Sequence, residues 1–569
     1  MAISFYHILG IVMSIVLIEI VGILSSRKVK TADDFSRAGG KAGTWVVCGT
    51  IMGTLIGGQS TVGTAQLAFT YGISAWWFTL GAALGCVALA IGYVIPLRRS
   101  NSTTLLEVVS KEYGKKAEVL GSILCSLGMF VSVVAQILSS SALLMTLFPV
   151  KFYFAAAISC LIMMMYVVFG GLWSAGIGGI VKLILLCISA LAGGVIVLSL
   201  TDGYHGIMTA IEEMMCVFKT PHSDVSTFVS ERYNNLLARG AGKDIGSGLS
   251  VILGVLATQS YAQGIWAGKT DSAARKGALY SAILTIPIGA ACVLIGLYMR
   301  GHYVTAEEVN ALVESGKSLP ENIGVMATTA QAFPLFITHC MPEFLGGIVL
   351  GTLLITIIIG GSGLTLGSST ILVRDVFMKI NPSLKESAKN LKVSRLTIVG
   401  ILLMSVFVAA TFSGSFINDL GFLSMGLRST AVFVPLTLAL FFPKRFKYKW
   451  IVVSIIAGTA ALILTQILNL PLDGIFVGLS VSVVCCLMGV RRSPRSERLK
   501  PRVVRSPSSL RRGRCSYSGR KRFSAVKWGL YDVRFSVFAA GVRNSRPPSL
   551  SASRRGRGVR STRSVELTR

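Results

Sequence analysis

Long apolar stretches recur along the chain up to about residue 490, and they constrain its fold more than any other feature. A helix needs about 20 apolar residues to cross the hydrocarbon core of a membrane. With 52% hydrophobic and 14% charged residues, the chain does not fit the composition of a soluble domain. The sequence therefore predicts an all-α polytopic membrane protein. We expect thirteen transmembrane helices, beginning near residues 5, 44, 74, 118, 152, 176, 247, 279, 343, 396, 417, 450 and 472.

Basic residues are concentrated in alternate loops between these helices. One set of loops holds 23 Lys and Arg residues, and the other set holds seven. Because cytoplasmic loops carry the excess of positive charge, we expect the first set to be cytoplasmic. With an odd number of spans, this places the N-terminus outside the plasma membrane and the C-terminus in the cytoplasm. The first set comprises residues 27–43, 98–117, 269–276, 374–395 and 444–449.

Two of the apolar spans, Trp45–Tyr71 and Ile245–Gly268, carry polar residues at their middle, and the first of them also carries a run of glycines. A broken helix leaves backbone groups unpaired, which a membrane tolerates only where the break lines a site for a solute or ion. The sequence therefore predicts a transporter with its solute between the two breaks. The alternative is that the polar groups only bond neighbouring helices. The expected solute-facing residues are Gln59, Ser60, Thr61 and Gln66 from the first span and Gln259, Tyr261 and Gln263 from the second.

Enzymatic and other functions receive little support from the sequence. No HExxH, CxxC or GxSxG motif occurs, and the segment Gly264–Thr270 lacks the glycine spacing of a phosphate-binding loop. We therefore expect no enzyme and no organic cofactor. A membrane solute sensor is the alternative of another class, but it would need a signalling module, and residues 491–569 show no periodic apolar pattern. A passive channel is disfavoured because paired broken helices are typical of carriers.

Five segments resemble, in their order and spacing, landmarks of the sodium:solute symporter family, which includes proline, pantothenate, iodide and sugar carriers. The resemblance covers roughly residues 5–490 and implies cation-coupled symport of a small organic solute by alternating access, with sodium as the coupling ion. The segments are KTADDFSRAGGKAG (Lys30–Gly43), TLLEVVSKEY (Thr104–Tyr113), GGL (Gly170–Leu172), AGKTDSAARKGAL (Ala267–Leu279) with Gln263 before it, and SSTILVRDVF (Ser368–Phe377). The GGL segment resembles a turn of the family.

The same resemblance implies a domain organisation. Residues 1–490 would form the transporter domain, built from two inverted five-helix repeats (5+5) at 44–200 and 247–442. One extra helix at 5–26 would precede the repeats, and two extra helices at 450–489 would follow them. The two broken spans are five helices apart, so each would occupy the first position of a repeat.

The cation site is where the chain departs from the family. The resemblance implies that backbone carbonyls at Gly53 and Ile56 hold sodium together with two hydroxyl groups of the ninth span. The positions of these hydroxyls are Ile359 and Gly360 here, and neither side chain has an oxygen. Because sodium requires oxygen ligands, this loss weakens the implied site.

Lys182 is a second departure, in the sixth span, where the family commonly has a Thr-Asp pair followed three residues later by Gln. An intramembrane lysine costs at least ~2.5 kcal/mol on insertion and is a functional candidate by default. We hypothesise that its ammonium group replaces sodium, so that transport is coupled to H+ or uncoupled. One alternative is that Lys182 snorkels to the end of its helix. Another is a shifted sodium site built from Thr356, Ser362, Thr365 and Ser368.

Arg428 is the other cation expected deep inside a span. An arginine at this depth usually faces a cavity or an anionic partner, and its planar fork suits a carboxylate. The sequence therefore predicts that Arg428 binds the solute, and it favours a carboxylate-bearing solute over a sugar.

The chain changes composition abruptly at Arg491. Residues 491–569 contain 23 Lys and Arg against three acidic residues, which gives this tail +20 of the formal net charge of +30. Its composition is typical of a disordered cytoplasmic segment. Three interpretations remain open: an arm on anionic membrane lipid, a nucleic-acid-binding arm, which we do not expect, or an out-of-frame translation artefact.

Overall fold

The computed structural model describes residues 4–27, 38–218, 224–316, 318–320, 323–412, 414–468, 470 and 472–491. The chain separates into two units, Met1–Ser496 and Glu497–Arg569. The second unit lies outside the described residues, as does nearly all of the predicted tail and the part of the family-like segment at 30–37. The predicted domain boundaries therefore stay predictions.

Helices make up nearly all of the described residues. The first part of the chain forms α1 (Phe5–Ser26), η1 (Ala38–Gly40), α3 (Thr44–Leu55), η2 (Gln59–Gly63), α4 (Thr64–Tyr71), η3 (Gly72–Trp76), α5 (Trp77–Ala88), η4 (Leu89–Tyr93), α6 (Val94–Arg99), α7 (Leu105–Tyr113), α8 (Lys115–Leu147) and α9 (Phe152–Leu200). The turns η2 and η4 are π-helical, and η1 and η3 are 3-10 helices.

The middle of the chain adds a short parallel pair of strands, in which Tyr303 lies opposite Gly324. Its elements are α10 (Gly203–Phe218), α11 (Val225–Tyr233), α12 (Ala241–Leu256), α13 (Gln259–Ala267), α14 (Asp271–His302), β1 (Tyr303–Thr305), α15 (Ala306–Glu314), β2 (Gly324–Met326), η5 (Thr329–Gln331) and α16 (Ala332–Cys340). The last part forms α17 (Glu343–Ile371), η6 (Leu372–Phe377), α18 (Met378–Ile380), η7 (Pro382–Lys385), α19 (Ser387–Thr411), α20 (Ile417–Arg428), η8 (Ser429–Phe433), α21 (Val434–Phe441), α22 (Tyr448–Ile467) and α23 (Gly474–Met488).

Among the described residues, eight helical segments are long and apolar enough to cross a membrane, and the bent pair α12–α13 makes nine. Shorter apolar helices at Phe5–Ile18, Thr44–Leu55, Phe152–Val168 and Gly474–Met488 account for the remaining predicted spans. The predicted all-α membrane fold is confirmed. The number of thirteen crossings and the inverted repeats stay predictions.

One local expectation is wrong. At Gly170–Leu172, where the resemblance implies a turn, the backbone is helical, and α9 joins the fifth and sixth predicted spans in a single helix of 49 residues. A glycine inside a helix costs only about 1 kcal/mol relative to alanine, so two adjacent glycines do not by themselves end a helix.

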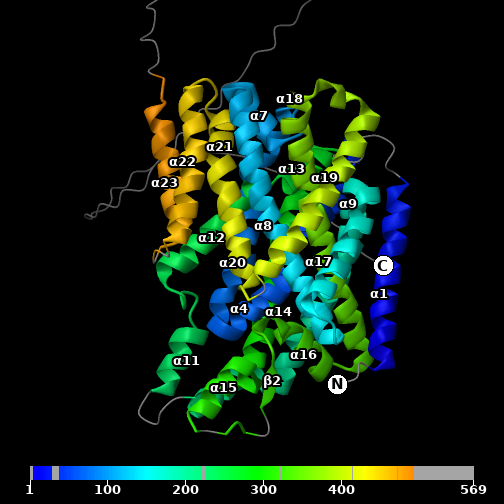
Figure 1. Ribbon diagram of the computed structural model, residues 1–569, viewed down its shortest axis with the longest axis vertical. Helices are drawn as coiled ribbons and strands as arrows, with labels where there is room; N and C mark the ends of the chain where they lie inside the picture. Colours follow the sequence, from blue (N-terminus) through cyan, green and yellow to red (C-terminus); the bar gives the residue numbers. More distant parts are fainter. Residues whose placement is uncertain are drawn as a thin grey trace, which may run out of the picture. The chain divides into compact units, whose positions relative to one another are not determined.

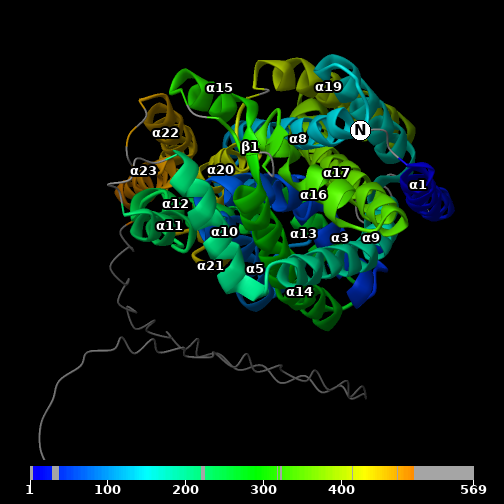
Figure 2. The same cartoon turned by 90° about the horizontal axis from the view of Figure 1, so that it is seen from below.

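The helices of the first unit separate its loops into two groups (Figure 1). The ends of the bundle near α7 and α18 carry the segments 98–117 and 374–395, which the charge pattern assigns to the cytoplasm. The opposite end carries α11 and α15, which lie in loops of the set with few basic residues, and the N-terminal end of α1. Helix α1 lies on one flank of the bundle, and α22 and α23 lie together on another (Figure 2). The sidedness of these ends in a membrane stays a prediction.

Glycines bring α3 and α9 unusually close together. A Cβ atom at Gly179 would lie 2.0 Å from the carbonyl oxygen of Gly49, and one at Gly49 would lie 2.4 Å from that of Gly176. No other residue type fits such a contact between backbones. Residues of α9 near Gly179 therefore lie directly beside the middle of α3.

Candidate functional site

The predicted interruption of the second span is observed. Helix α3 ends at Leu55, Ile56 is extended (φ −88°, ψ 106°), and the chain resumes as the π-helical turn η2 at Gln59. The Gly58 N–H donates to Gln136 Oε1 of α8 over 2.6 Å. This bond satisfies a backbone group that the break frees, while carbonyls on the other side of the break remain open to other donors.

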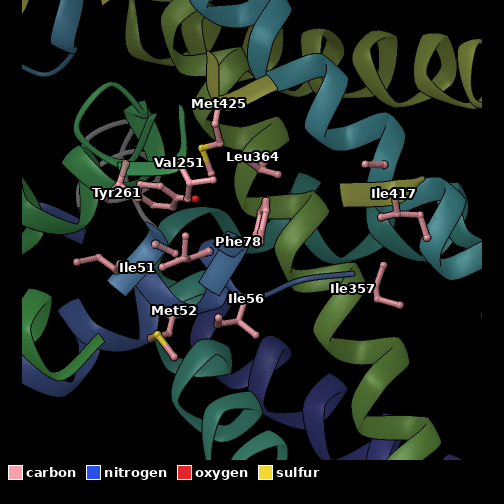
Figure 3. Packing of buried hydrophobic residues seen from close by; sticks show 14 of the residues in the cluster. Ile51, Met52, Ile56, Phe78, Val251, Tyr261, Ile357, Leu364, Ile417 and Met425 are labelled. Atoms are coloured by element: carbon pink, nitrogen blue, oxygen red, sulfur yellow. The ribbon is translucent and has the colours of Figure 1, made fainter. Parts of the chain in front are cut away.

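The seventh span is also interrupted. Helix α12 ends at Leu256 and α13 begins at Gln259, with a bend of 42° between them. Thr258 at the break has an extended backbone (φ −97°, ψ 120°), and its hydroxyl donates to the Gly254 carbonyl over 2.6 Å. Side chains from both broken helices and from neighbouring helices pack around the breaks, among them Ile56, Tyr261 and Met425 (Figure 3).

Lys182 lies at the first break. Its Nζ atom donates to the carbonyl oxygens of Gly53 at 2.7 Å and Thr356 at 3.1 Å, and to that of Ile56. The side chain is only 1% exposed, so it does not snorkel towards the end of its helix. The ammonium group therefore contacts both carbonyls at which the resemblance implies sodium, and it contacts a third carbonyl from α17.

The remaining predicted cation-site residues lie on α17. Ile359 and Gly360 are fully buried and offer no side-chain oxygen, and a Cβ atom at Gly360 would lie 3.2 Å from Gly57 Cα. The Ser362 hydroxyl donates to the Met163 carbonyl over 3.3 Å. The Thr356 hydroxyl is buried without a hydrogen-bond partner among the described residues.

Arg428 joins the surroundings of the two breaks. Its Nη1 atom donates to Thr258 Oγ1 over 2.7 Å, and its Nη2 atom donates to Ser132 Oγ over 3.1 Å and Ser424 Oγ over 2.8 Å. Gln59 Nε2 donates to the same Ser132 hydroxyl over 3.3 Å. The guanidinium is fully buried, and no carboxylate of the described residues forms an ion pair with it. Its Nε atom donates to the Ser424 carbonyl over 3.1 Å, so neutral hydroxyl and carbonyl oxygens accept these hydrogen bonds.

Three of the predicted solute-facing residues of the first span already have partners within the protein. Ser60 Oγ donates to the Leu55 carbonyl over 3.0 Å, and Thr61 Oγ1 donates to the Gly57 carbonyl over 2.9 Å. The amide of Gln66 connects helices: its Nε2 donates to Thr329 Oγ1 over 3.1 Å and its Oε1 accepts from the Ile417 N–H over 3.0 Å. Of this group, Gln59 is the residue that lies beside the Arg428 cluster.

Among the predicted residues of the seventh span, Gln259 and Gln263 bond other parts of the protein, and Tyr261 lies beside Arg428. The side-chain amide of Gln259 bonds the backbone with both of its polar atoms: Nε2 donates to the Thr103 carbonyl and Oε1 accepts from the Leu105 N–H. Gln263 Nε2 donates to Thr370 Oγ1 over 3.0 Å, whereas its buried Oε1 has no partner among the described residues. The Tyr261 ring is 1% exposed and lies at the break, where it is a neighbour of Arg428. The proposed roles of all these residues stay predictions.

Sequence reasoning did not identify Ser132, Ser424, Thr258 and Gln136, which complete the polar groups around the breaks. Serine and threonine are common in membrane helices, where they bond the preceding turn, so their presence in an apolar span is a weak signal. Gln136 was the more visible of the four, because it is the largest polar group in its span.

An aromatic and charged layer covers the Gln59 side of the cluster. The rings of Phe78 and Phe422 are 5.5 Å apart, and the Arg239 guanidinium lies 5.1 Å above the Phe422 ring. Arg239 pairs with Asp244 at 2.7 Å and with Asp419 at 3.0 Å. This layer connects the segment before α12 to the start of α20 at the end of the bundle that carries α11.

We expect Asp244→Ala to destabilise the protein strongly. The Arg239 and Asp244 side chains are 3% and 0% exposed, so the variant leaves a buried guanidinium short of a partner, at a cost of about 3 to 5 kcal/mol. The melting temperature of the purified protein in detergent measures the effect. Asp271→Ala is the control, because Asp271 pairs with Arg98 at 2.6 Å but is 53% exposed and should contribute at most about 1 kcal/mol. Equal shifts in both variants would contradict the prediction.

The model of the sodium:solute symporter family matches residues 35–467 of the chain. A relative with similar sequence is the high-affinity choline transporter 1 of Drosophila melanogaster, which is 22% identical over 410 residues. This alignment covers 71% of the present chain and 62% of the fly protein, so the chain spans less than two thirds of that relative's length.

Among solved structures, the fold is similar to that of a Na+-coupled sialic acid symporter in a substrate-bound, outward-open state. The TM-score is 0.66 at 18% sequence identity, and the alignment covers 86% of this chain and 97% of the other. A mutant of the manganese transporter from Eremococcus coleocola matches at a TM-score of 0.42 and 12% identity, over 81% of this chain and 97% of the other. The first likeness establishes a transporter fold, and the second is too low to support an argument.

Proposed function

Because the chain belongs to the sodium:solute symporter family, we propose that it is a secondary transporter that carries a small organic solute across the plasma membrane by alternating access. The family resemblance predicted from the sequence is confirmed by this match, as is a transporter rather than an enzyme. The solute site that we propose lies between the two breaks, where Gln59, Tyr261 and Arg428 converge with the hydroxyls of Ser132 and Ser424. Broken helices tolerate exposed backbone groups only at such a site.

The coupling ion is the second part of the proposal. The family name implies sodium, but the contacts of Lys182 support an ammonium group in the place of the ion. It donates to the carbonyls of Gly53, Ile56 and Thr356, and the two positions that would add hydroxyl ligands have none. The carrier is therefore sodium-independent, either coupled to H+ or uncoupled. Sodium coupling is the alternative, and the unpaired Thr356 hydroxyl is the observation that favours it.

The solute class is the third part. Arg428 is buried without an ion-pair partner among the described residues, and a carboxylate supplies the charge and the paired acceptors that its guanidinium lacks. Choline, the solute in the name of the fly relative, is itself a cation. It would enter a region that contains two buried positive side chains, and like charges in a medium of low dielectric repel strongly. We therefore propose a carboxylate-bearing solute, such as an organic or amino acid.

Sodium independence is the expected result of transport assays. A thermal-shift panel of small carboxylates, amino acids, sugars and choline on the purified protein identifies a binder, because a ligand of the native state raises stability with its saturation. Uptake of that binder into proteoliposomes is then measured with a sodium gradient, with a proton gradient and with neither. We expect replacement of external Na+ by K+ to change the initial rate by less than about twofold, since Lys182 provides a positive charge equal to that of the ion.

The comparison of the two gradients with the condition that has neither separates the alternatives. Faster uptake with an inward proton gradient assigns H+ as the coupling ion, and equal rates under all conditions assign an uncoupled carrier. A steep sodium requirement in the unmodified protein would overturn the proposed replacement of sodium. Preferential binding of choline in the panel would overturn the proposed solute class.

A further inference from the structure

Two adjacent residues at the second break contact different parts of the protein: Thr258 contacts Arg428, and Gln259 contacts the start of α7. Thr258 Oγ1 accepts a hydrogen bond from Arg428 Nη1 over 2.7 Å, which connects the break to the proposed solute site. The next residue, Gln259, bonds the backbone at the start of α7: its Oε1 accepts from the Leu105 N–H and its Nε2 donates to the Thr103 carbonyl, both over 2.9 Å. We call the contact of Gln259 with Thr103 and Leu105 the inner latch.

The start of α7 is also held from a second side. The Thr104 hydroxyl accepts from the Glu107 N–H over 3.0 Å as the N-cap of α7, and it donates to Asp375 Oδ1 of η6 over 2.8 Å. Asp375 Oδ2 accepts from Ser122 Oγ of α8 over 2.9 Å. Thr104, Asp375 and Ser122 are all buried. The first turn of α7 therefore connects α13, η6 and α8 at the end of the bundle that the charge pattern assigns to the cytoplasm (Figure 1).

The inner latch persists only while the break keeps its present backbone position. The Gln259 side chain is fully buried, and a buried donor or acceptor that loses its partner carries an unfavourable desolvation cost. Thr258 restrains that backbone, because its hydroxyl is fixed between the Gly254 carbonyl and the Arg428 guanidinium. A ligand that takes Nη1 of Arg428 removes one of these two restraints.

We propose that Thr258 and Gln259 couple occupancy of the solute site to opening of the predicted cytoplasmic side. This inference rests on the proposed function, since it assigns the competitor of Thr258 to the carboxylate of the solute. The carboxylate accepts from Arg428 Nη1 in place of the threonine hydroxyl, the break is released, and Gln259 leaves the backbone of Thr103 and Leu105. The path between α13, α7 and η6 then opens.

Cys125 of α8 provides a natural reporter for this opening. Its Sγ atom lies 3.7 Å from the carbonyl oxygen of Ala257, the residue before Thr258, and its side chain is fully buried. Separation of α13 from α7 and α8 exposes this thiol. A protein in which the ten other cysteines of the chain are replaced retains Cys125 alone.

The test measures the labelling rate of Cys125 by a membrane-impermeant maleimide in nanodiscs. We expect slow labelling in the protein with an intact latch. Gln259→Ala removes two buried hydrogen bonds of about 1 kcal/mol each and should raise the rate by about tenfold or more. Gln259→Glu keeps the acceptor for Leu105 but loses the donor to Thr103, so we expect an intermediate increase. Thr258→Val, which keeps the shape of the side chain, should also raise the rate.

A matched control comes from the other broken helix. Gln66 makes an equivalent pair of bonds, to Thr329 and Ile417, at the opposite end of the bundle. Gln66→Ala should leave Cys125 labelling unchanged. Thr258 and Gln259 act in one sequence of events, so the double variant Thr258→Val/Gln259→Ala should label no faster than the faster single variant. If the two residues acted independently, the fold increases in labelling rate of the single variants would multiply.

Acetate, a small carboxylate probe, tests the solute step. At equal ionic strength it should raise labelling of the unmodified single-cysteine protein and leave Thr258→Val unchanged. Unchanged labelling in both Gln259 variants, in protein that remains monodisperse on gel filtration, would overturn the inner latch. Raised labelling in the variants without an acetate effect would overturn its link to Arg428. The variant comparison needs no solute, so a failure of the proposed transport function, seen as absent carboxylate uptake, is distinguishable from a failure of the latch.

Discussion

Lys182→Met abolishes solute uptake in proteoliposomes, with an expected loss of about 100-fold or more in the initial rate. Methionine retains the apolar length of lysine but donates no hydrogen bond. The buried carbonyls of Gly53, Ile56 and Thr356 then lose their common donor, and each unsatisfied buried group costs about 1 to 3 kcal/mol. The site is left without a positive charge, and the carbonyls at the end of α3 repel the Thr356 carbonyl of α17.

A matched lysine on the same helix provides the control. Lys151 precedes the first turn of α9 and is exposed, so Lys151→Met should retain uptake within about twofold, as surface substitutions usually do. The amount of reconstituted protein is measured for every variant to separate transport from expression. Lys182→Ala tests the alternative, because its smaller side chain leaves space for an ion. A steep sodium requirement that is present in the unmodified protein and survives with full uptake in Lys182→Ala would reject the assignment of Lys182 as the cation of this site.

Arg428→Gln should abolish uptake of carboxylates while sparing expression. Hydrogen bonds to charged groups contribute about 1.5 to 3 kcal/mol each, so loss of a paired contact with the solute lowers affinity by roughly 100-fold. Arg428→Lys should be nearly as damaging. A single ammonium cannot reproduce the fork with which Arg428 contacts Thr258, Ser132 and Ser424 at once. Binding by thermal shift and uptake of the same solute measure the two variants.

The control for Arg428 is an arginine outside the membrane-spanning helices. Arg445 lies in the turn after α21, is exposed, and stacks over the Phe442 ring, so Arg445→Gln should bind and transport as the unmodified protein does. If Arg428→Gln retains carboxylate binding and uptake, the residue has a structural role and the proposed solute class is wrong.

The breaks and the two buried cations were visible in the sequence because each violates a strong rule of the membrane environment. Glycines and polar residues at the middle of a span, and a lysine or arginine within one, are costly unless the fold uses them. The second and seventh spans are discontinuous, and Lys182 and Arg428 are both buried beside the breaks. These features depend on the position of one residue along a span, which sequence reveals directly.

Partner identity was the part that the sequence did not reveal. Gln66 and Gln259 looked equivalent to Gln59, yet their amides bond loops and helix starts far along the chain. A glutamine side chain reaches whichever backbone groups the fold brings near, and one sequence contains no record of that proximity. The role of Ser132 was hidden for the same reason, since a serine that bonds its own helix and one that bonds Arg428 look identical in sequence.

The close contact of α3 and α9 also restricts how such a carrier can change its driving ion in evolution. Position 179 is glycine here, where the family resemblance implies aspartate, and a Cβ atom there would lie 2.0 Å from the Gly49 carbonyl oxygen. A single reversion to aspartate would therefore force the two backbones apart before it supplied any ligand. Glycine at 179, lysine at 182 and the missing hydroxyls at 359 and 360 form an interdependent set, so under the proposed replacement of sodium no single substitution would rebuild a sodium site.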